Sequence, residues 1–407
     1  MKNNKSPKVA ILTHFNVCNF GANMQALSTF SYLRNNGYDP IFIDWVGYQK
    51  ELFTNIPKIQ KEAHTQFIKT YLTVSPPLYN ENEIIKYLRE NAIFNIIVGS
   101  DAVFSLNTWY DRIKINKRGI HLLKSSPDKI FPNVFWLNQL INDPQFRIAM
   151  MSVSSQNAIY QLIPYKTKQN IRKCLNRYNY ISVRDYWTQK MVKNISQKDV
   201  NVTPDPMWAF NTNYPLADDK ENFLKNLNID SPYILLGFQN AYIKKTKKWL
   251  DEFITIAHKE RYQCIPLPFS FGYITADYDT QIKFPLSPID WYKLIKYSNG
   301  YVGYNMHPAI VCMANNIPCF SLDNYGINIL KYFNIRTSSK IYDIYKSANK
   351  PNYCKTLKYF FDSPDSSPQQ VMNLIANYDY KNGNCFLEKQ IKEYSSMMNN
   401  ISNLFSK

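Results

Sequence analysis

The sequence predicts a two-domain α/β protein, and three observations support this prediction. Short apolar segments, typical of buried parallel strands, alternate with segments whose apolar residues recur at helical spacing. This alternation pauses in a polar tract at residues 211–226 and then starts again. At 407 residues the chain is also too long for one ordinary core. We therefore expect two α/β domains that face each other across a cleft.

The first predicted domain covers residues 1–215 and opens as a strand–helix–strand unit. Residues 9–13 are apolar, residues 24–33 have helical periodicity, and Asn35-Asn36-Gly37 ends that helix. The aromatic segment at residues 104–146 is broken by prolines, so we expect it to be rich in loops and to face the cleft. Further strands are expected at residues 41–44, 94–98, 147–154 and 180–185.

The second predicted domain covers residues 216–385 and repeats the same alternation. Helices are expected over residues 246–259 and 289–298, and Pro308 is expected to open another. Residues 386–405 are amphipathic, so we expect residues 386–407 to form a C-terminal helix that packs back on the first domain. The strands of this domain are expected at residues 233–238, 263–267, 301–304 and 317–321.

The charge balance favours anionic partners. Lys and Arg outnumber Asp and Glu by 48 to 31, a formal net charge of +17. Nucleic acid, phosphate-bearing small molecules and the anionic face of a membrane all fit such a balance. The basic residues are dispersed, however, and they form no compact nucleic-acid-binding motif. We therefore expect no nucleic-acid partner.

The sequence indicates a cytoplasmic protein with reduced thiols. It contains no run of about 18 uncharged apolar residues and no charged-then-apolar signal segment. Its seven cysteines are scattered, without a paired CxxC spacing. We therefore expect neither a disulfide framework nor a metal site.

Polar side chains that could do chemistry follow two of the predicted strands. Gly99-Ser100-Asp101 ends an apolar strand, which puts Asp101 at the carboxyl edge of the sheet as a candidate base or hydroxyl-binding group. Capping a helix is its alternative role. Arg184 also follows a strand, and it could grip a carboxylate or phosphate or form a structural pair with Asp185. Asp205 lies between two prolines and is typical of a rigid turn.

His307 is the candidate acid or base of the second domain. It follows an apolar strand and lies directly before the helix that Pro308 is expected to open. The positive end of a helix dipole favours the neutral form of a histidine, which can then accept a proton. A histidine that only caps the helix or fills the loop is the alternative.

The loop at residues 15–23 is a candidate anion-binding loop. It holds one glycine instead of the three of a dinucleotide fingerprint, but a loop that leads into a helix still offers backbone N–H groups to a phosphate or carboxylate. A plain turn is the alternative. The residues expected to contact substrate are Asn19, Gly21, Asn23, Gly99, Ser100 and Asn305.

Taken in order, these motifs resemble the polysaccharide pyruvyl transferase family. The resemblance rests on residues 19–26, on Val98-Gly99-Ser100-Asp101, on residues 181–185, on Asp205-Pro206 and on the late strand–His307–helix unit. It covers roughly residues 8–330. It implies two Rossmann-like domains facing a cleft, similar to the glycosyltransferase-B fold.

The resemblance also implies an activity. Family members transfer a pyruvyl group from phosphoenolpyruvate to a sugar of a cell-surface polysaccharide precursor, such as a capsular polysaccharide or exopolysaccharide, and form a ketal. The acceptor is a lipid-linked or soluble saccharide, with peripheral contact to the anionic inner face of the membrane. No metal is implied, and no cofactor besides phosphoenolpyruvate as the donor. His307 falls on the position of the family's catalytic acid. Asp101 falls on that of the base or of the group that positions the acceptor, and Arg184 falls on that of a residue that binds the donor phosphoenolpyruvate.

One residue departs from the family pattern, and two alternatives to pyruvyl transfer stay open. Many members have an arginine two positions before the histidine, where this chain has Asn305. Asparagine can hydrogen-bond a phosphate but cannot neutralise it. A glycosyltransferase that uses a nucleotide sugar is therefore the first alternative. A non-catalytic glycan-binding protein is the second, because 15% of the residues are aromatic.

Overall fold

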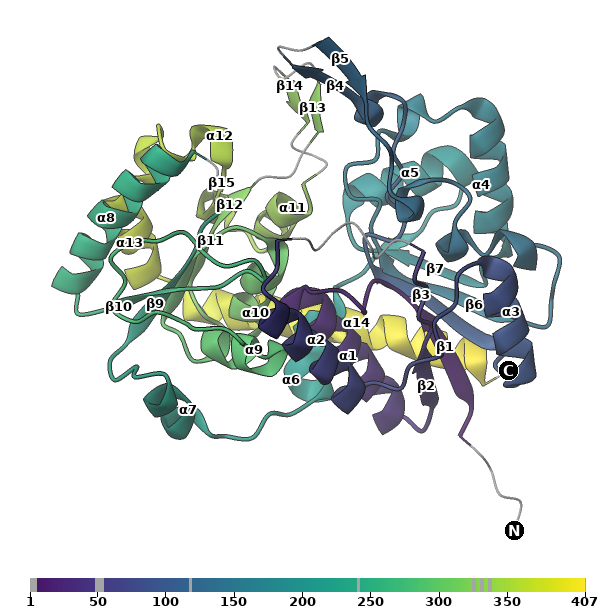
Figure 1. Cartoon of the computed structure of the whole chain (residues 1–407), viewed down its shortest axis with the longest axis horizontal. Coiled ribbons are helices and arrows are strands. Elements are labelled where there is room, and N and C mark those ends of the chain that lie inside the picture. Colours follow the sequence, from purple (N-terminus) through teal and green to yellow (C-terminus); the bar gives the residue numbers. More distant parts are fainter. Residues whose placement is uncertain are drawn as a thin grey trace.

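The protein is described by a computed structural model that covers residues 6–47, 55–116, 119–239, 242–323, 327–329, 333–335 and 339–406. It contains two parallel β-sheets, one in each half of the chain, and helices pack on both faces of each (Figure 1). The predicted fold class, α/β with two domains, is confirmed.

The first sheet has six parallel strands, and it contains all five strands that the sequence predicts for this half. An additional short strand, β8, lies at its edge. In spatial order the strands are β2 (Asp39–Phe42), β1 (Lys8–Leu12), β3 (Asn95–Asp101), β6 (Arg147–Val153), β7 (Tyr180–Val183) and β8 (Asn201–Val202). The helices of this half are α1 (Phe20–Asn35), α2 (Lys58–Tyr71), α3 (Glu81–Glu90), α4 (Tyr165–Arg177), α5 (Tyr186–Ser196) and α6 (Phe210–Asn213).

The second sheet has five parallel strands, of which the sequence predicts four. In spatial order they are β10 (Gln263–Pro266), β9 (Tyr233–Gly237), β11 (Gly300–Gly303), β12 (Cys319–Asp323) and β15 (Cys354–Thr356). The tract expected to connect the domains includes a short helix, α7 (Lys220–Asn226). The other helices of this half are α8 (Ile243–Lys259), α9 (Pro288–Lys296), α10 (Met306–Ala314), α11 (Lys340–Ser347), α12 (Leu357–Phe360), α13 (Pro368–Ala376) and α14 (Tyr380–Phe405).

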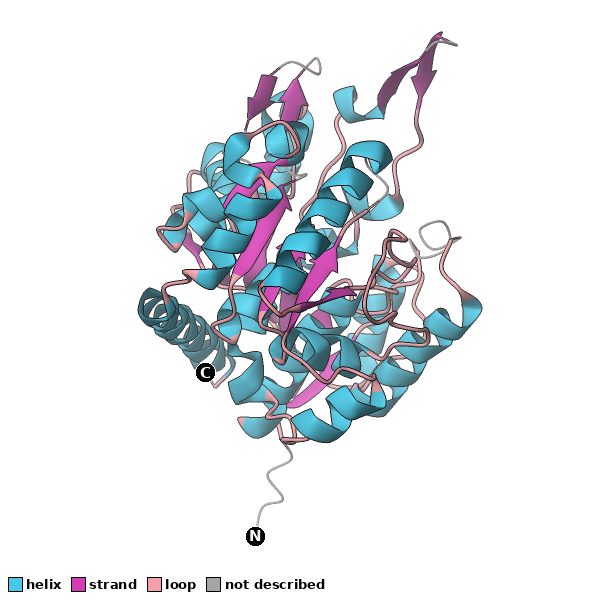
Figure 2. Ribbon diagram, turned by 90° about the vertical axis from the view of Figure 1, so that its left-hand side faces the viewer, coloured by secondary structure: helices cyan, strands magenta, loops and turns pink. Residues whose placement is uncertain are grey.

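The expectation that the aromatic segment at residues 104–146 faces the cleft is wrong for its large rings. Phe104, Phe135 and Trp136 are buried in the core on the outer face of the first sheet. The rest of the segment includes a two-stranded antiparallel hairpin, β4 (Ile113–Asn116) and β5 (Gly119–Leu122). It stands out from the body of the first domain in two perpendicular views (Figures 1 and 2). A second hairpin, β13 (Ile327–Ile329) and β14 (Phe333–Ile335), belongs to the other domain.

The inner faces of the two sheets share one continuous hydrophobic core. It includes Val9 from β1, Leu27 from α1, Tyr301 from β11 and Ile310 from α10. At the seam α1 packs against α9, where the rings of Phe20 and Trp291 stack with centroids 5.5 Å apart. The two domains are therefore joined by packed side chains as well as by the chain.

Helix α14 runs along both domains (Figure 1). Near its start, the Asn316 side chain donates a hydrogen bond of 2.8 Å to Asn384. Near its end, the Arg147 guanidinium donates a hydrogen bond of 3.0 Å to the carbonyl of Phe405, and Ser182 contacts the sulfur of Met397 at 3.2 Å. The helix thus begins on the second domain and ends against β6 and β7 of the first.

Candidate active site

Strand ends from both domains converge on one cluster of charged side chains. Asp101 is the last residue of β3, and Arg184 directly follows β7. Asp205 follows β8, and His307 lies in the first turn of α10, just after β11. In a parallel sheet the carboxyl ends of the strands share one edge, which explains how residues so far apart in sequence meet.

Arg184 is buried between two carboxylates. Its side chain is 3% exposed, its Nη1 lies 2.7 Å from Asp205 Oδ2, and its Nη2 lies 3.5 Å from Asp101 Oδ1. Burial alone would lower the pKa of Arg184, but Asp205 and Asp101 outweigh it and raise the pKa. The alternative pairing with Asp185 is wrong, because Asp185 caps α5 and accepts the backbone N–H of Thr188.

One edge of this guanidinium makes no hydrogen bond to a described residue, although Asp101 Oδ1 lies 3.5 Å from its Nη2. Arg184 Nε and Nη2 are buried and make no hydrogen bond within the described part of the chain. A buried donor without an acceptor is costly, and the Nε–Nη2 edge of an arginine matches a carboxylate or phosphate in a two-pronged geometry. The site is therefore suited to binding an anion at Arg184.

Asp101 is held in its ionised form. Burial favours the neutral carboxyl, but nearby His14 and Arg184 oppose this and lower the pKa of Asp101 to about 2. Its Oδ1 accepts the backbone N–H of Ala102, and no helix starts there, so it is not a helix cap. Asp101 is therefore a fixed negative charge at the edge of the sheet.

His307 is neutral at pH 7. Burial lowers its pKa to about 4, although Asp205, whose Oδ2 lies 3.8 Å from His307 Nε2, opposes this effect. The helix begins at Met306 and not at Pro308, so His307 lies inside its first turn. Its ring packs on Gly21 of α1, where a Cβ atom would come within 2.6 Å of His307 Cβ and closer to the ring. Because Gly21 has no side chain, the imidazole of His307 has room at the boundary between the two domains.

A cavity of about 260 Å³ lies between the domains in front of this cluster. Three of the expected substrate-contacting residues, Asn19, Gly21 and Asn305, line it together with Asp101 and His307. Three aromatic side chains, Phe269, Phe271 and Trp291, are also among its lining residues. Asn305 has a positive φ of 75° and makes no capping hydrogen bond with its side chain. The lining of the cavity thus combines charged groups with aromatic rings.

The other three expected contact residues lie beneath this cavity and are not among its lining residues. Asn23 is fully buried and donates to the carbonyl of Phe15 at 2.8 Å, which holds the loop in place. Ser100 donates to the carbonyl of Ser152 at 3.0 Å. Gly99 packs against β6, where a Cβ would lie 2.8 Å from Val153 Cγ1. These residues support the site from below.

The sequence matches the family model described as polysaccharide pyruvyl transferase over residues 19–326, which is most of the chain. The chain belongs to this family. The match includes Asp101, Arg184, Asp205 and His307 and ends before Lys340. A search of curated protein sequences finds no match.

Solved structures show that this pyruvyl transferase family member has the fold of nucleotide-sugar enzymes. The UDP-GlcNAc 2-epimerase of Methanocaldococcus jannaschii superposes with a TM-score of 0.57 at 10% identity, covering 97% of this chain and 99% of that one. The Neisseria meningitidis enzyme bound to UDP-GlcNAc gives 0.54 at 8% identity, covering 98% and 100%. The spinosyn forosaminyltransferase SpnP gives 0.51 at 7% identity, covering 98% and 100%. The two-domain glycosyltransferase-B-like fold is therefore confirmed.

Sequence reasoning missed the roles of Asp205 and Lys340 in the site. The sequence around Asp205 predicts only a rigid turn, yet this residue is 1% exposed and also accepts a hydrogen bond of 2.6 Å from Gln25 of α1. Its position before Pro206 in a family motif was the available signal. Lys340 begins α11 and lines the cavity, and burial lowers its pKa to about 8. No local pattern separates Lys340 from the many other lysines of the chain.

His14 and Asp128 extend the cluster on the side of the first domain. His14 Nδ1 lies 3.8 Å from Asp101 Oδ2, and His14 Nε2 lies 3.3 Å from Asp128 Oδ2. His14 therefore lies between Asp128 and Asp101, and this contact positions the carboxylate of Asp101. Sequence reasoning missed both residues. His14 follows β1, and this strand end was the available signal, whereas Asp128 lies in the proline-broken aromatic segment and has no such signal.

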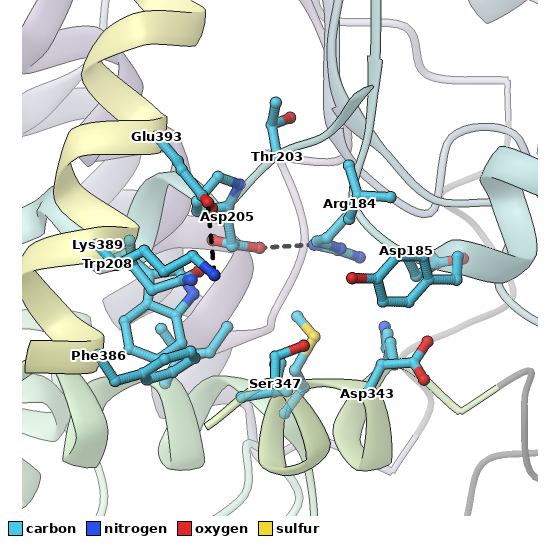
Figure 3. Close-up of a pocket in the computed structure, with 18 residues that line it drawn as sticks. Arg184, Asp185, Thr203, Asp205, Trp208, Asp343, Ser347, Phe386, Lys389 and Glu393 are labelled. Atoms are coloured by element: carbon cyan, nitrogen blue, oxygen red, sulfur yellow. Dashed lines mark hydrogen bonds and ion pairs between the residues drawn. The ribbon is translucent and has the colours of Figure 1, made fainter. Parts of the chain in front are cut away.

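A smaller cavity, of about 140 Å³, lies behind the cluster and beneath α14 (Figure 3). Arg184, Asp205 and Lys340 line it. The rings of Trp208 and Phe386 form another part of its wall and meet edge to face with centroids 5.4 Å apart. Lys340 and Met306 line both cavities. The cluster thus separates a front cavity from a back one.

The described residues include no helix that is long and apolar enough to cross a membrane. Among the same residues, no group of three or more His, Cys, Asp or Glu side chains could hold a metal ion.

Proposed function

We propose that this protein transfers a pyruvyl group from phosphoenolpyruvate to two hydroxyls of a sugar in a cell-surface polysaccharide precursor and forms a ketal. The observation that carries the proposal is the buried Arg184 of a polysaccharide pyruvyl transferase family member. It lies between Asp101 and Asp205, and its Nε and Nη2 make no hydrogen bond in the described part of the chain. The enzyme would work in the cytoplasm on a lipid-linked or soluble saccharide.

The donor needs cations, and Arg184 and Lys340 supply them. Phosphoenolpyruvate carries a carboxylate and a phosphate. The guanidinium of Arg184, which lines the back cavity, and the ammonium of Lys340, which lines both cavities, would hold these groups. Lys340 is mainly protonated at pH 7, since its pKa is about 8. The Arg184–Lys340 pair would take over the charge that the family arginine supplies at the position of Asn305.

The reaction needs a proton acceptor and a proton donor. In the first step a sugar hydroxyl attacks C2 of the enol, loses its proton to a base, and an acid protonates the methylene carbon. In the second step the C2–O bond to phosphate breaks, another hydroxyl bonds to C2, and the proton of that hydroxyl leaves with the inorganic phosphate. His307, neutral with a pKa of about 4, fits the base better than the acid that the sequence led us to expect. Lys340 is then the proton donor, and Asp101 orients the acceptor hydroxyl.

The sugar would lie against the aromatic side chains of the front cavity. Phe269 and Phe271 stack with centroids 5.4 Å apart, and Phe271 is 54% exposed. Exposed aromatic faces suit the apolar faces of sugar rings. Asp101 and Asn19 also line this cavity, and they can hydrogen-bond hydroxyls.

A glycosyltransferase that uses a nucleotide sugar is the second candidate function. Two observations favour it: Asn305 in place of an arginine, and a fold shared with enzymes of nucleotide sugars. A non-catalytic glycan-binding protein would use the same aromatic side chains but would not need a buried Arg184.

A phosphate-release assay tests the proposal. Purified protein is mixed with phosphoenolpyruvate and lipid-linked saccharide from the source organism, and inorganic phosphate is measured. Wild type should release phosphate only when the acceptor is present, and Arg184→Lys should lower the rate about 10²-fold or more because the two-pronged contact is lost. Arg34→Lys, at an exposed arginine of α1, is the matched control and should behave as wild type.

Isothermal titration separates the rivals. Binding of phosphoenolpyruvate that weakens in Arg184→Lys supports pyruvyl transfer. Tight binding of a nucleoside diphosphate, together with no phosphate release, would replace it with the glycosyltransferase. Binding of saccharide alone, without turnover of either donor, would leave the glycan-binding protein.

A further inference from the structure

The β4–β5 hairpin exposes apolar side chains on one face. Ile113 pairs in register with Leu122, and Ile120 lies two residues before Leu122, so the three side chains share a face. Ile113 is 38% exposed, Leu122 68% and Ile120 74%. Leu123 and Trp109, at the base of the hairpin, are also exposed. Exposed apolar side chains that gather on one surface in this way are typical of an interaction site.

The same segment is strongly basic. Between Trp109 and Lys124 the sequence holds five basic residues and one acidic residue, a formal charge of +4. The basic residues are Arg112, Lys114, Lys117, Arg118 and Lys124. A segment that combines apolar side chains, a tryptophan and an excess of positive charge matches the interface of an anionic bilayer.

We propose that the β4–β5 hairpin docks this protein on the surface of an anionic lipid bilayer. The hairpin extends beyond the rest of the first domain (Figures 1 and 2), so it can reach a flat surface before the body of the protein does. Ile120 and Leu122 enter the headgroup region, and the positive charge of the segment attracts lipid phosphates. Charge disfavours a second copy of this chain as the occupant, because two hairpins of +4 repel each other.

The hairpin is directly connected to the catalytic cluster. The chain that leaves β5 reaches Asp128 six residues after Leu122, and Asp128 contacts His14 of the site. Asn107 holds the base of the hairpin in place through two hydrogen bonds. Its backbone N–H donates to the carbonyl of Lys129 at 2.9 Å, and its side chain donates to the hydroxyl of Ser125 at 3.2 Å. If the proposed function is right, docking would hold the cleft close to a lipid-linked acceptor.

Vesicle co-sedimentation tests the docking surface without any substrate. Full-length protein is mixed with vesicles of phosphatidylcholine alone, or of equal parts phosphatidylcholine and phosphatidylglycerol. Wild type should pellet with the anionic vesicles only. The double variant Ile120→Asp/Leu122→Asp should bind them at least about twentyfold more weakly, since each unit of charge near such a surface changes binding roughly fivefold.

The matched control is Ile59→Asp/Tyr380→Asp, which adds the same charge at exposed apolar residues of α2 and α14. Binding of the control should stay within about twofold of wild type, because its charges lie away from the bilayer. Equal binding by the hairpin variant and the control, or no binding of wild type to anionic vesicles, would overturn the proposal. So would a dimer, seen by analytical ultracentrifugation, that the hairpin variant abolishes.

The result is independent of the proposed activity. Phosphate release with a soluble saccharide should be unchanged in the hairpin variant, because neither Ile120 nor Leu122 lines a cavity of the site. If the hairpin variant loses vesicle binding and keeps phosphate release, the result supports both the docking surface and the proposed activity. Vesicle binding without phosphate release would support docking and refute only the proposed function.

Discussion

Gly21→Ala should lower the rate of the enzyme about 10²-fold while leaving it folded. The added Cβ would lie 2.6 Å from His307 Cβ and closer to the imidazole, whereas ordinary contacts between such atoms begin at 3.4 Å. The ring must therefore move by about 1 Å, a misplacement that costs roughly 10²-fold in rate. Overpacking destabilises by about 1–3 kcal/mol, and the better helix propensity of alanine in α1 offsets about 1 kcal/mol of this. The loss of activity should exceed the loss of stability.

Phosphate release and thermal unfolding, measured on the same preparation, check this prediction. Gly300→Ala in β11 is the matched control, because its Cβ would meet the end of the Ile375 side chain at 3.1 Å, away from the site. Gly21→Ala should add nothing further to the defect of His307→Ala, since both changes act through the same ring. If Gly21→Ala folds and keeps the wild-type rate, the prediction is wrong, and catalysis does not depend on the position of the His307 ring.

Three further predictions concern the charges of the cluster. Asp205→Asn removes the closest partner of buried Arg184 and should lower the free energy of unfolding by about 3–5 kcal/mol in urea titrations, whereas Asp199→Asn at an exposed ion pair should cost less than about 1 kcal/mol. The depressed pKa of His307, about 4, means that the unfolded chain binds more protons between pH 6.5 and 4. Stability should therefore fall on acidification through this range, by up to about 3 kcal/mol from this residue, and the fall should be smaller in His307→Gln; an equal slope in both would contradict the assignment. Lys340, with a pKa of about 8, should give a rate that declines as the pH rises through 8, whereas Lys340→Arg, which keeps the charge but gives up no proton, should lower the rate and remove this decline.

The fold and part of the site could be predicted because parallel sheets follow a simple rule. Apolar strands are readable in the sequence, and their carboxyl ends share an edge, so Asp101, Arg184 and His307 could be expected at one cleft before the structure placed them there. Hydrophobic periodicity also predicted α14, because its buried residues recur at helical spacing.

The remaining features depend on contacts between distant segments. Lys340 arrives at the site from α11, and nothing near it in the sequence records this. The approach of His307 to Gly21 links positions 286 residues apart, and a single glycine in a loop does not reveal which side chain needs the space. Asp128 reaches His14 only through the fold of an aromatic segment whose rings are buried in the outer core.

The course of α14 has a consequence for protein synthesis. Met397 of this helix covers a face of β6 and β7, and those strands are synthesised early. The first residue of α14, Tyr380, comes 227 residues after Val153, the last residue of β6. At about 5–20 residues per second this delay lasts on the order of 10–45 s. Throughout that time Ala149 and Met151 of β6, which share a hydrophobic core with Met397, lack the cover of α14, so we expect the nascent chain to bind chaperones at this stage.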